Sequence, residues 1–134
     1  MMTLFPAVFV ALFLVLQYAK TAPIGPVVNH DTNDELIQEV VKAAENIRLK
    51  NLDFVKDQFK FNGEVRYAKS QKHADGTLYE IQCVFVEVEC KDESSCTIVQ
   101  DNPKKILFTI WGIDRRDANN QIYFSQFTYR YKYI

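Results

Sequence analysis

The side chains that most often carry out catalysis are few in this chain of 134 residues. It has two histidines, His30 and His73, and three cysteines. A cysteine nucleophile needs a nearby base, and Cys83 with His73 could form such a pair. Cys83, however, stands among apolar residues in the middle of an expected strand, where burial disfavours the thiolate. The sequence therefore gives little support to a thiol hydrolase.

Metal, acid–base and phosphate chemistry are also poorly supported. His73, Asp75 and one cysteine do not have the spacing of a zinc site. Glu87 and Glu89 alternate along one strand face, which is typical of exposed charge. The four glycines do not form a phosphate-binding loop. We therefore expect a protein that is not an enzyme, has no catalytic residues, and uses no metal or cofactor.

The amino-terminal residues are typical of a secretory signal peptide. Residues 4–16 read LFPAVFVALFLVL, followed by polar and small residues up to Ala22. This apolar stretch is shorter than the roughly twenty residues that a membrane-spanning helix needs, although an uncleaved anchor is the alternative. We expect cleavage after Thr21, so that residues 1–21 are removed and residues 22–134 form a single extracellular domain.

The charge of the chain excludes some partners. Its formal net charge is −1, and removal of Lys20 with the signal peptide makes it about −2. A nucleic-acid or anionic-membrane surface would need a basic excess. We therefore expect no nucleic-acid partner and no membrane association after signal cleavage.

The three cysteines would enter an oxidising compartment, where neighbouring thiols form disulfides. Cys83 and Cys90 are seven positions apart on one expected strand, so they point to opposite faces. Cys90 and Cys96 enclose the polar turn formed by residues 91–95, and we expect them to pair. Cys83 is then either a buried thiol in a monomer or the link of a disulfide dimer.

A single helix is predicted near the start of the mature chain. Residues 22–31 contain two prolines and a glycine and predict an extended, mobile leader. Thr32 and Glu35 form a capping-box pattern, which predicts a helix over residues 33–49. Its apolar residues recur at helical spacing: Leu36, Ile37, Val40, Val41, Ala44 and Ile47.

The rest of the chain has the alternating pattern of strands. Asn62-Gly63 predicts a hairpin turn, and Asp75-Gly76 predicts another. Strands are expected over residues 77–90, 106–113 and 122–134, with a charged turn over 114–120. Tyrosines on one face of the last strand belong either to the core or to a contact surface. The predicted fold is α+β, with one amphipathic helix packed on a curved antiparallel sheet.

The order of these features resembles that of secreted cystatins, and the resemblance covers most of the mature chain. It is carried by a leader glycine, an alanine-containing helix, a turn between glutamine and glycine, and a cysteine at the end of the next strand. The matching residues are Gly25, Ala43, Ala44, Asn46, Gln71, Gly76, Tyr79 and Cys90.

This resemblance implies inhibition of papain-like cysteine proteases. In cystatins the leader, a Gln-x-Val-x-Gly hairpin and a Pro-Trp hairpin form a wedge that fills the protease cleft. Gly25 matches the leader glycine, and Gln71 and Gly76 match the ends of the first motif. The protease-binding residues that the resemblance implies, with the nearest tryptophan included, are Gly25, Gln71, Lys72, His73, Ala74, Asp75, Gly76 and Trp111.

The chain also departs from the cystatin pattern. The segment between Gln71 and Gly76 has one residue more than the motif and carries charge in place of valine. The second hairpin, near residues 112–115, has no Pro-Trp, and the family's second disulfide is absent. Two hypotheses follow: a secreted cysteine-protease inhibitor with a divergent wedge, or a non-inhibitory secreted cystatin-like binding module.

Overall fold

A computed structural model describes residues 23–92 and 94–134. The predicted signal peptide, residues 1–21, lies outside the described residues. The described chain divides into two compact units. The first, here called the hairpin unit, contains residues 23–29, 69–80 and 110–130, and the second, the helix unit, contains residues 30–68, 81–109 and 131–134. No helix in the described part of the chain has the length and apolar character needed to cross a membrane.

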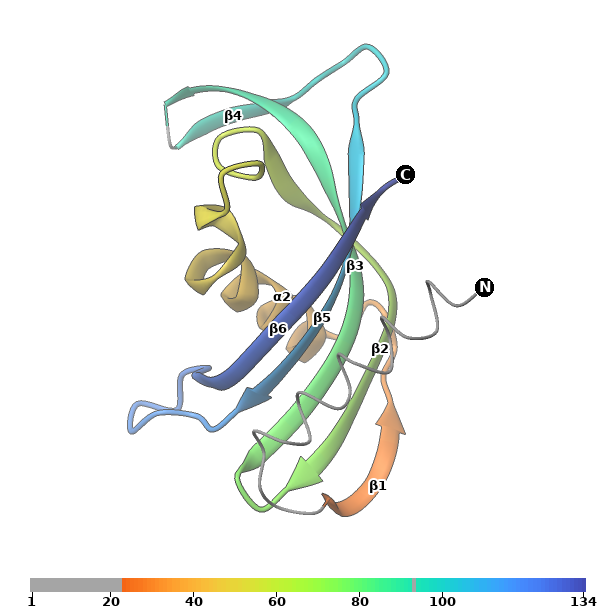
Figure 1. The fold of residues 1–134 in the computed structure, drawn as a ribbon, viewed down its shortest axis with the longest axis vertical. Coiled ribbons are helices and arrows are strands. Elements are labelled where there is room, and N and C mark those ends of the chain that lie inside the picture. Colours follow the sequence, from red (N-terminus) through yellow and green to blue (C-terminus); the bar gives the residue numbers. More distant parts are fainter. Residues whose placement is uncertain (1–22, 93) are drawn as a thin grey trace. The chain divides into compact units, whose positions relative to one another are not determined.

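The strands of the described residues form one six-stranded sheet, in the order β1-β2-β3-β5-β6 with β4 paired to β3 (Figure 1). The elements in chain order are β1 (Pro23–Asn29), α2 (Glu35–Ile47), a 3-10 helix η1 (Leu49–Asn51), β2 (Phe59–His73), β3 (Gly76–Asp92), β4 (Ser95–Ile98), β5 (Lys105–Asp114) and β6 (Phe124–Tyr133). The predicted α+β class, one helix on an antiparallel sheet, is confirmed.

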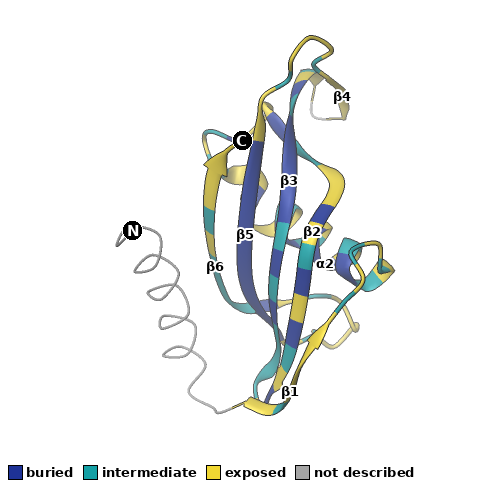
Figure 2. Ribbon diagram, turned by 90° about the vertical axis from the view of Figure 1, so that its right-hand side faces the viewer, coloured by how far each residue is buried: buried dark blue, intermediate teal, exposed yellow. Residues whose placement is uncertain are grey.

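The apolar stripe of α2 supplies one side of the core of the helix unit. Within this unit, Figure 1 shows α2 on one side of the strand segments, and Figure 2 shows continuous burial along parts of β3 and β5. Phe85 and Phe108 meet edge to face, with ring centroids 4.9 Å apart. Each buried aliphatic or aromatic side chain contributes about 1.5–3 kcal/mol. The fully buried helix residues are Ile37, Val40, Val41 and Ala44.

The helix begins two residues later than predicted, because its cap is Asp34 and not Thr32. The side chain of Asp34 accepts a hydrogen bond from the backbone N–H of Leu36, at 2.9 Å. Thr32 contributes its backbone carbonyl, which accepts from Nε2 of Gln38. An aspartate cap also places negative charge at the positive end of the helix dipole.

The prediction of a hairpin at Asn62-Gly63 is wrong, because both residues lie inside the continuous strand β2. A tight hairpin of this sequence needs positive φ at both residues, and only Gly63 of the two has it, with φ of 90°. Asn62 instead accepts a hydrogen bond from the N–H of Glu64, and the carbonyl of Gly63 accepts from Gln38. The dipeptide therefore forms a local irregularity that the helix stabilises.

The predicted disulfide between Cys90 and Cys96 is confirmed. The two residues are partners in the register of β3 and β4, a short strand that the sequence pattern did not predict. Cys83 lies in the middle of β3 and is completely buried. Burial, with a smaller contribution from the charge of Glu45, raises the pKa of the Cys83 thiol to about 12.

In the helix unit, the aromatic face of β6 packs on the core as predicted, and it is also exposed. Tyr131 stacks on Phe54, with ring centroids 4.4 Å apart, and Tyr133 lies edge-on to Phe59. Both tyrosines nevertheless remain partly open to solvent. These rings therefore cover the core and also form part of the surface.

The Asp34 cap predicts a difference between two neighbouring alanine substitutions. Asp34→Ala should lower the free energy of unfolding by about 1 kcal/mol, because the N–H of Leu36 loses its acceptor. Thr32→Ala is the matched control and should change it by less than about 0.5 kcal/mol. Urea denaturation followed by circular dichroism measures both, and a larger effect at Thr32 would contradict the cap.

The burial of Cys83 predicts that its thiol is unreactive in the folded protein. Iodoacetamide at neutral pH should leave Cys83 unmodified under native conditions, because the protonated, buried thiol is a poor nucleophile. In concentrated guanidinium chloride, without reductant, the same reagent should add one group per chain. Mass spectrometry distinguishes the two results, and rapid native labelling would show that the site opens.

Candidate functional site

The leader is a strand of the hairpin unit rather than the mobile segment predicted from its prolines. β1 pairs with the end of β2, where Pro23 faces His73 and Val27 faces Gln71. The side-chain amide of Gln71 also donates a hydrogen bond to the carbonyl of Gly25, at 2.9 Å. Two predicted site residues, Gly25 and Gln71, are therefore in direct contact, and the leader is held against the first hairpin.

The first hairpin lies against the end of β5. Gly76 has φ of +141°, and a Cβ atom there would be 2.5 Å from the carbonyl oxygen of Asp114. Only glycine allows so close an approach. The carboxylate of Asp75 also forms an ion pair with Arg115, at 4.0 Å. The turn between β2 and β3 and the residues after β5 are thus neighbours in space.

The other residues predicted in this turn differ in accessibility. Lys72 and Ala74 are exposed, and the Cβ of Lys72 would lie 3.6 Å from a Cβ built on Gly25. His73 points inward and is only 3% exposed. Neither ring nitrogen of His73 has a hydrogen-bond partner among the described residues. Lys72 and Ala74 are therefore accessible to a partner, whereas His73 is not.

Trp111 also points inward and is 2% exposed. Its indole N–H donates to the carboxylate of Glu80 at 2.9 Å, which joins β5 to β3. The next residue, Gly112, leaves room for the ring of Phe124, since a Cβ there would lie 2.8 Å from that ring. Trp111 therefore supports the end of the sheet and presents no aromatic ring at the surface.

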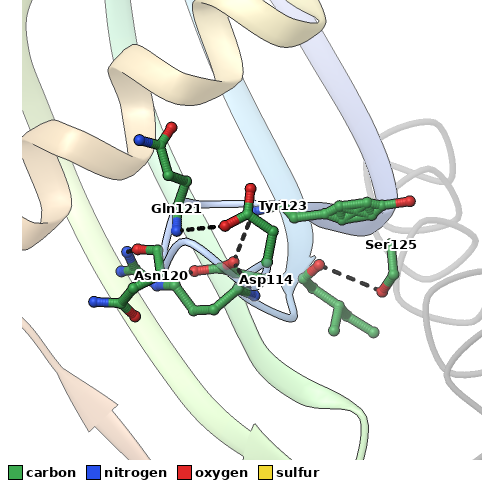
Figure 3. A network of polar contacts seen from close by, with 8 residues as sticks. Asp114, Asn120, Gln121, Tyr123 and Ser125 are labelled. Carbon is green, nitrogen blue, oxygen red and sulfur yellow. Dashed lines mark hydrogen bonds and ion pairs between the residues drawn. The ribbon is translucent and has the colours of Figure 1, made fainter.

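The loop between β5 and β6 is ordered by two aspartates, which the sequence pattern predicted only as part of a charged turn. Oδ1 of Asp114 accepts from the N–H groups of Arg116 and Tyr123, both at 2.9 Å (Figure 3). Oδ2 of Asp114 forms an ion pair with Arg116 at 3.0 Å. Asp117 accepts in the same way from the N–H groups of Asn119 and Gln121.

Aspartate and asparagine often cap the backbone of a turn two residues further along the chain. The run from Asp114 to Asn120 contains two of each and was in principle a signal for this loop. The sequence did not show that the carboxylate of Asp114 would be buried. Nor did it show that Arg116 and Asn120 would adopt positive φ, at 52° and 61°.

The surface of β1 is apolar and exposed. Ile24, Val27 and Val28 are 68%, 54% and 47% exposed, and Figure 2 shows β1 as an exposed edge of the sheet. A shallow hollow of about 220 Å³ lies beside Val27, lined also by Leu78, Glu80 and residues 69–71. Apolar side chains around a few polar groups are typical of a contact surface.

The hairpin unit therefore contains three adjoining segments: β1, the turn between β2 and β3, and the loop between β5 and β6. Among residues 23–92 and 94–134, no cluster of three or more metal-ligating side chains occurs. The arrangement offers backbone groups, apolar side chains and a few charges. Such groups can bind a partner through hydrogen bonds, apolar contacts and ion pairs.

Compared with models of known protein families and with curated proteins, the sequence matches none of them. The class of the protein is therefore defined by its fold, an α+β domain with one helix on an antiparallel sheet.

The role of Asp114 predicts a large effect of its removal. Asp114→Ala should lower the free energy of unfolding by about 2–3 kcal/mol, because two backbone N–H groups lose a buried acceptor. Asp75→Ala, which removes a partly exposed ion pair, should cost less than about 1 kcal/mol. Urea denaturation measures both, and equal effects would contradict the role of Asp114 as the organising residue.

Proposed function

We propose that this protein is a secreted inhibitor of papain-like cysteine proteases. In this proposal β1, the turn between β2 and β3 and the loop between β5 and β6 together enter and block the active-site cleft. The observation that carries the proposal is the direct contact among these segments. Gln71 binds the carbonyl of Gly25, Gly76 packs on the backbone of Asp114, and Asp75 pairs with Arg115.

The three segments are already held in fixed conformations before binding, and this favours the proposed function. A flexible loop loses conformational entropy when it enters a cleft, and a loop that is already fixed avoids most of that cost. Here β1 is paired with β2, and Asp114 fixes the second loop. The segments that would enter the cleft therefore need little rearrangement.

The apolar side chains of β1 supply the contact energy that such an inhibitor needs. Ile24, Val27 and Val28 are available without rearrangement. Burial of apolar surface stabilises a complex by about 25 cal/mol per Å² before association costs are subtracted. An inhibitor of this kind requires no catalytic group of its own, because blocking the cleft is sufficient.

The charge at the tip of the first hairpin is partly compensated within the protein. Asp75 would be costly to transfer alone into an apolar cleft. Its pairing with Arg115, however, allows both charges to enter together and to keep a partner. Lys72 is exposed and has no such pairing among the described residues, so the cleft that fits best offers an acidic or water-filled position to it.

The burial of Trp111 and His73 favours an alternative function, a non-inhibitory secreted cystatin-like binding module. Neither residue supplies an aromatic anchor at the tip of the hairpin unit, and aromatic anchors often dominate tight interfaces. In this alternative the same surface of β1 and the two loops binds a partner other than a protease. The two functions share a site and differ in its target.

Titration of the mature protein against papain and a lysosomal-type homologue tests the proposal. We expect stoichiometric inhibition at micromolar or lower concentration. Gly76→Ala should weaken inhibition at least about tenfold, because the added Cβ pushes the first hairpin away from Asp114. A chain that begins at Val27 should also be weaker, because it lacks Gly25 and the exposed Ile24.

Gly63→Ala is the matched control for Gly76→Ala. Gly63 also has positive φ, but a Cβ atom there meets nothing within 4 Å. A side chain is therefore strained at both positions, and only Gly76→Ala disturbs the proposed site. No inhibition at micromolar concentration by the folded protein would exclude the inhibitor function. Equal weakening of inhibition by the two variants would show that the inhibitory site lies elsewhere.

A further inference from the structure

The connection between α2 and β2 in the helix unit lines a second site, which is open to solvent and made of residues other than those of the proposed wedge. A cavity of about 350 Å³ lies between the end of the helix and the start of the strand. This volume is within the range of small-molecule sites in proteins. The lining residues are Asn46, Lys50, Asn51, Val55, Lys56, Asp57, Phe59 and Lys60.

The charge of this cavity is opposite to that of the whole chain. Three lysines, Lys50, Lys56 and Lys60, line it together with one acidic residue, Asp57, whereas the chain as a whole has a net charge of −1. None of the three lysines forms an ion pair in the described part of the protein. Their ammonium groups are therefore available to an external anion.

The base of the cavity is formed by buried side chains and backbone hydrogen bonds. Val55 and Phe59 are buried beneath it, and the N–H of Phe59 donates to the carbonyl of Val55 at 3.0 Å. The N–H of Lys56 donates to the carbonyl of Leu52 at 2.9 Å. Lys56 thus rises from a hydrogen-bonded turn that lies between Lys50 in η1 and Lys60 in β2.

The amides of Asn46 and Asn51 add hydrogen-bond donors to the same cavity. Like the lysine ammonium groups, they make no hydrogen bond to other described residues. Donors therefore outnumber acceptors around the cavity, with the carboxylate of Asp57 as the main exception. This donor set matches the oxygen atoms of an oxyanion.

The position at the end of α2 works against anion binding, but less strongly than the lysines favour it. The C-terminus of a helix carries about half a negative charge. Three lysines and one aspartate give the lining a net charge of +2. In addition, the C-cap N–H of Arg48 already satisfies the carbonyl of Ala44. The net field in the cavity therefore favours an anion.

We propose that this lysine cavity binds a small multivalent oxyanion that carries phosphate or sulfate groups. Lysine ammonium groups act as compact point charges suited to such oxygens. The volume admits a ligand with two such groups, such as pyrophosphate or a sulfated disaccharide unit. Two or more negative charges are needed to engage three separate ammonium groups at once. This site does not depend on the protease-inhibitor function.

Titration with two probes, inorganic pyrophosphate and a disulfated heparin disaccharide, tests this inference in the full mature protein. Chemical shifts of the backbone amides of residues 46–60 report binding, and we expect saturable shifts at low ionic strength. The Lys50→Gln/Lys56→Gln/Lys60→Gln variant should lose at least about tenfold in affinity, since each exposed charge contributes about threefold. The relative affinities of the two probes distinguish a compact diphosphate from a sulfated sugar as the preferred ligand.

Two further variants make this test specific. Lys42→Gln/Lys91→Gln/Lys132→Gln removes the same charge from exposed positions outside the cavity and should bind normally. Asp57→Asn should bind about threefold more tightly, because it removes the one carboxylate of the lining and asparagine tolerates the positive φ at that position. No saturable shift with either probe at millimolar concentration, or equal loss in the two triple variants, would overturn the inference.

Discussion

Two backbone N–H groups at the end of the hairpin unit depend on a single carboxylate, that of Asp114. The backbone of the same residue faces Gly76 so closely that no side chain fits between them. Asp114 therefore fixes the second loop through its side chain and positions the first hairpin through its carbonyl. Two further contacts involve residues close to Asp114 in the chain. Arg115 forms an ion pair with Asp75, and Gly112 packs against Phe124.

This arrangement connects local turn chemistry with the ability to bind. Short turns held by hydrogen bonds have few alternative conformations, so they would lose little conformational entropy in the proposed complex. The exposed valine and isoleucine side chains of β1 are also held in place, because Gln71 binds the backbone of the strand that carries them. Under the proposed function, these fixed turns would hold the small apolar surface of β1 in place for recognition.

Periodicity predicted the fold well, because one helix and several strands each bury a single face. The Cys90–Cys96 pair was also predictable, since the strand pattern kept Cys83 and Cys90 on opposite faces. The helix cap and the role of Asn62-Gly63 could not be predicted. Each depends on which of several polar groups forms a hydrogen bond in the folded protein. Asp34 replaced Thr32 as the cap, and Gln38 stabilised Gly63 from the helix. The burial of Trp111, His73 and Asp114 likewise follows from tertiary packing that alternation does not encode.

The prolines of β1 also bear on the solubility of the protein. β1 is the last strand at one edge of the sheet, and its exposed face is apolar, which is a combination that invites strand addition between molecules. Pro23 and Pro26 have no backbone N–H and cannot donate to an incoming strand. A shift in register between Pro23 and Val27 further interrupts the edge. The same strand therefore combines an exposed apolar surface with an edge that is a poor template for strand addition.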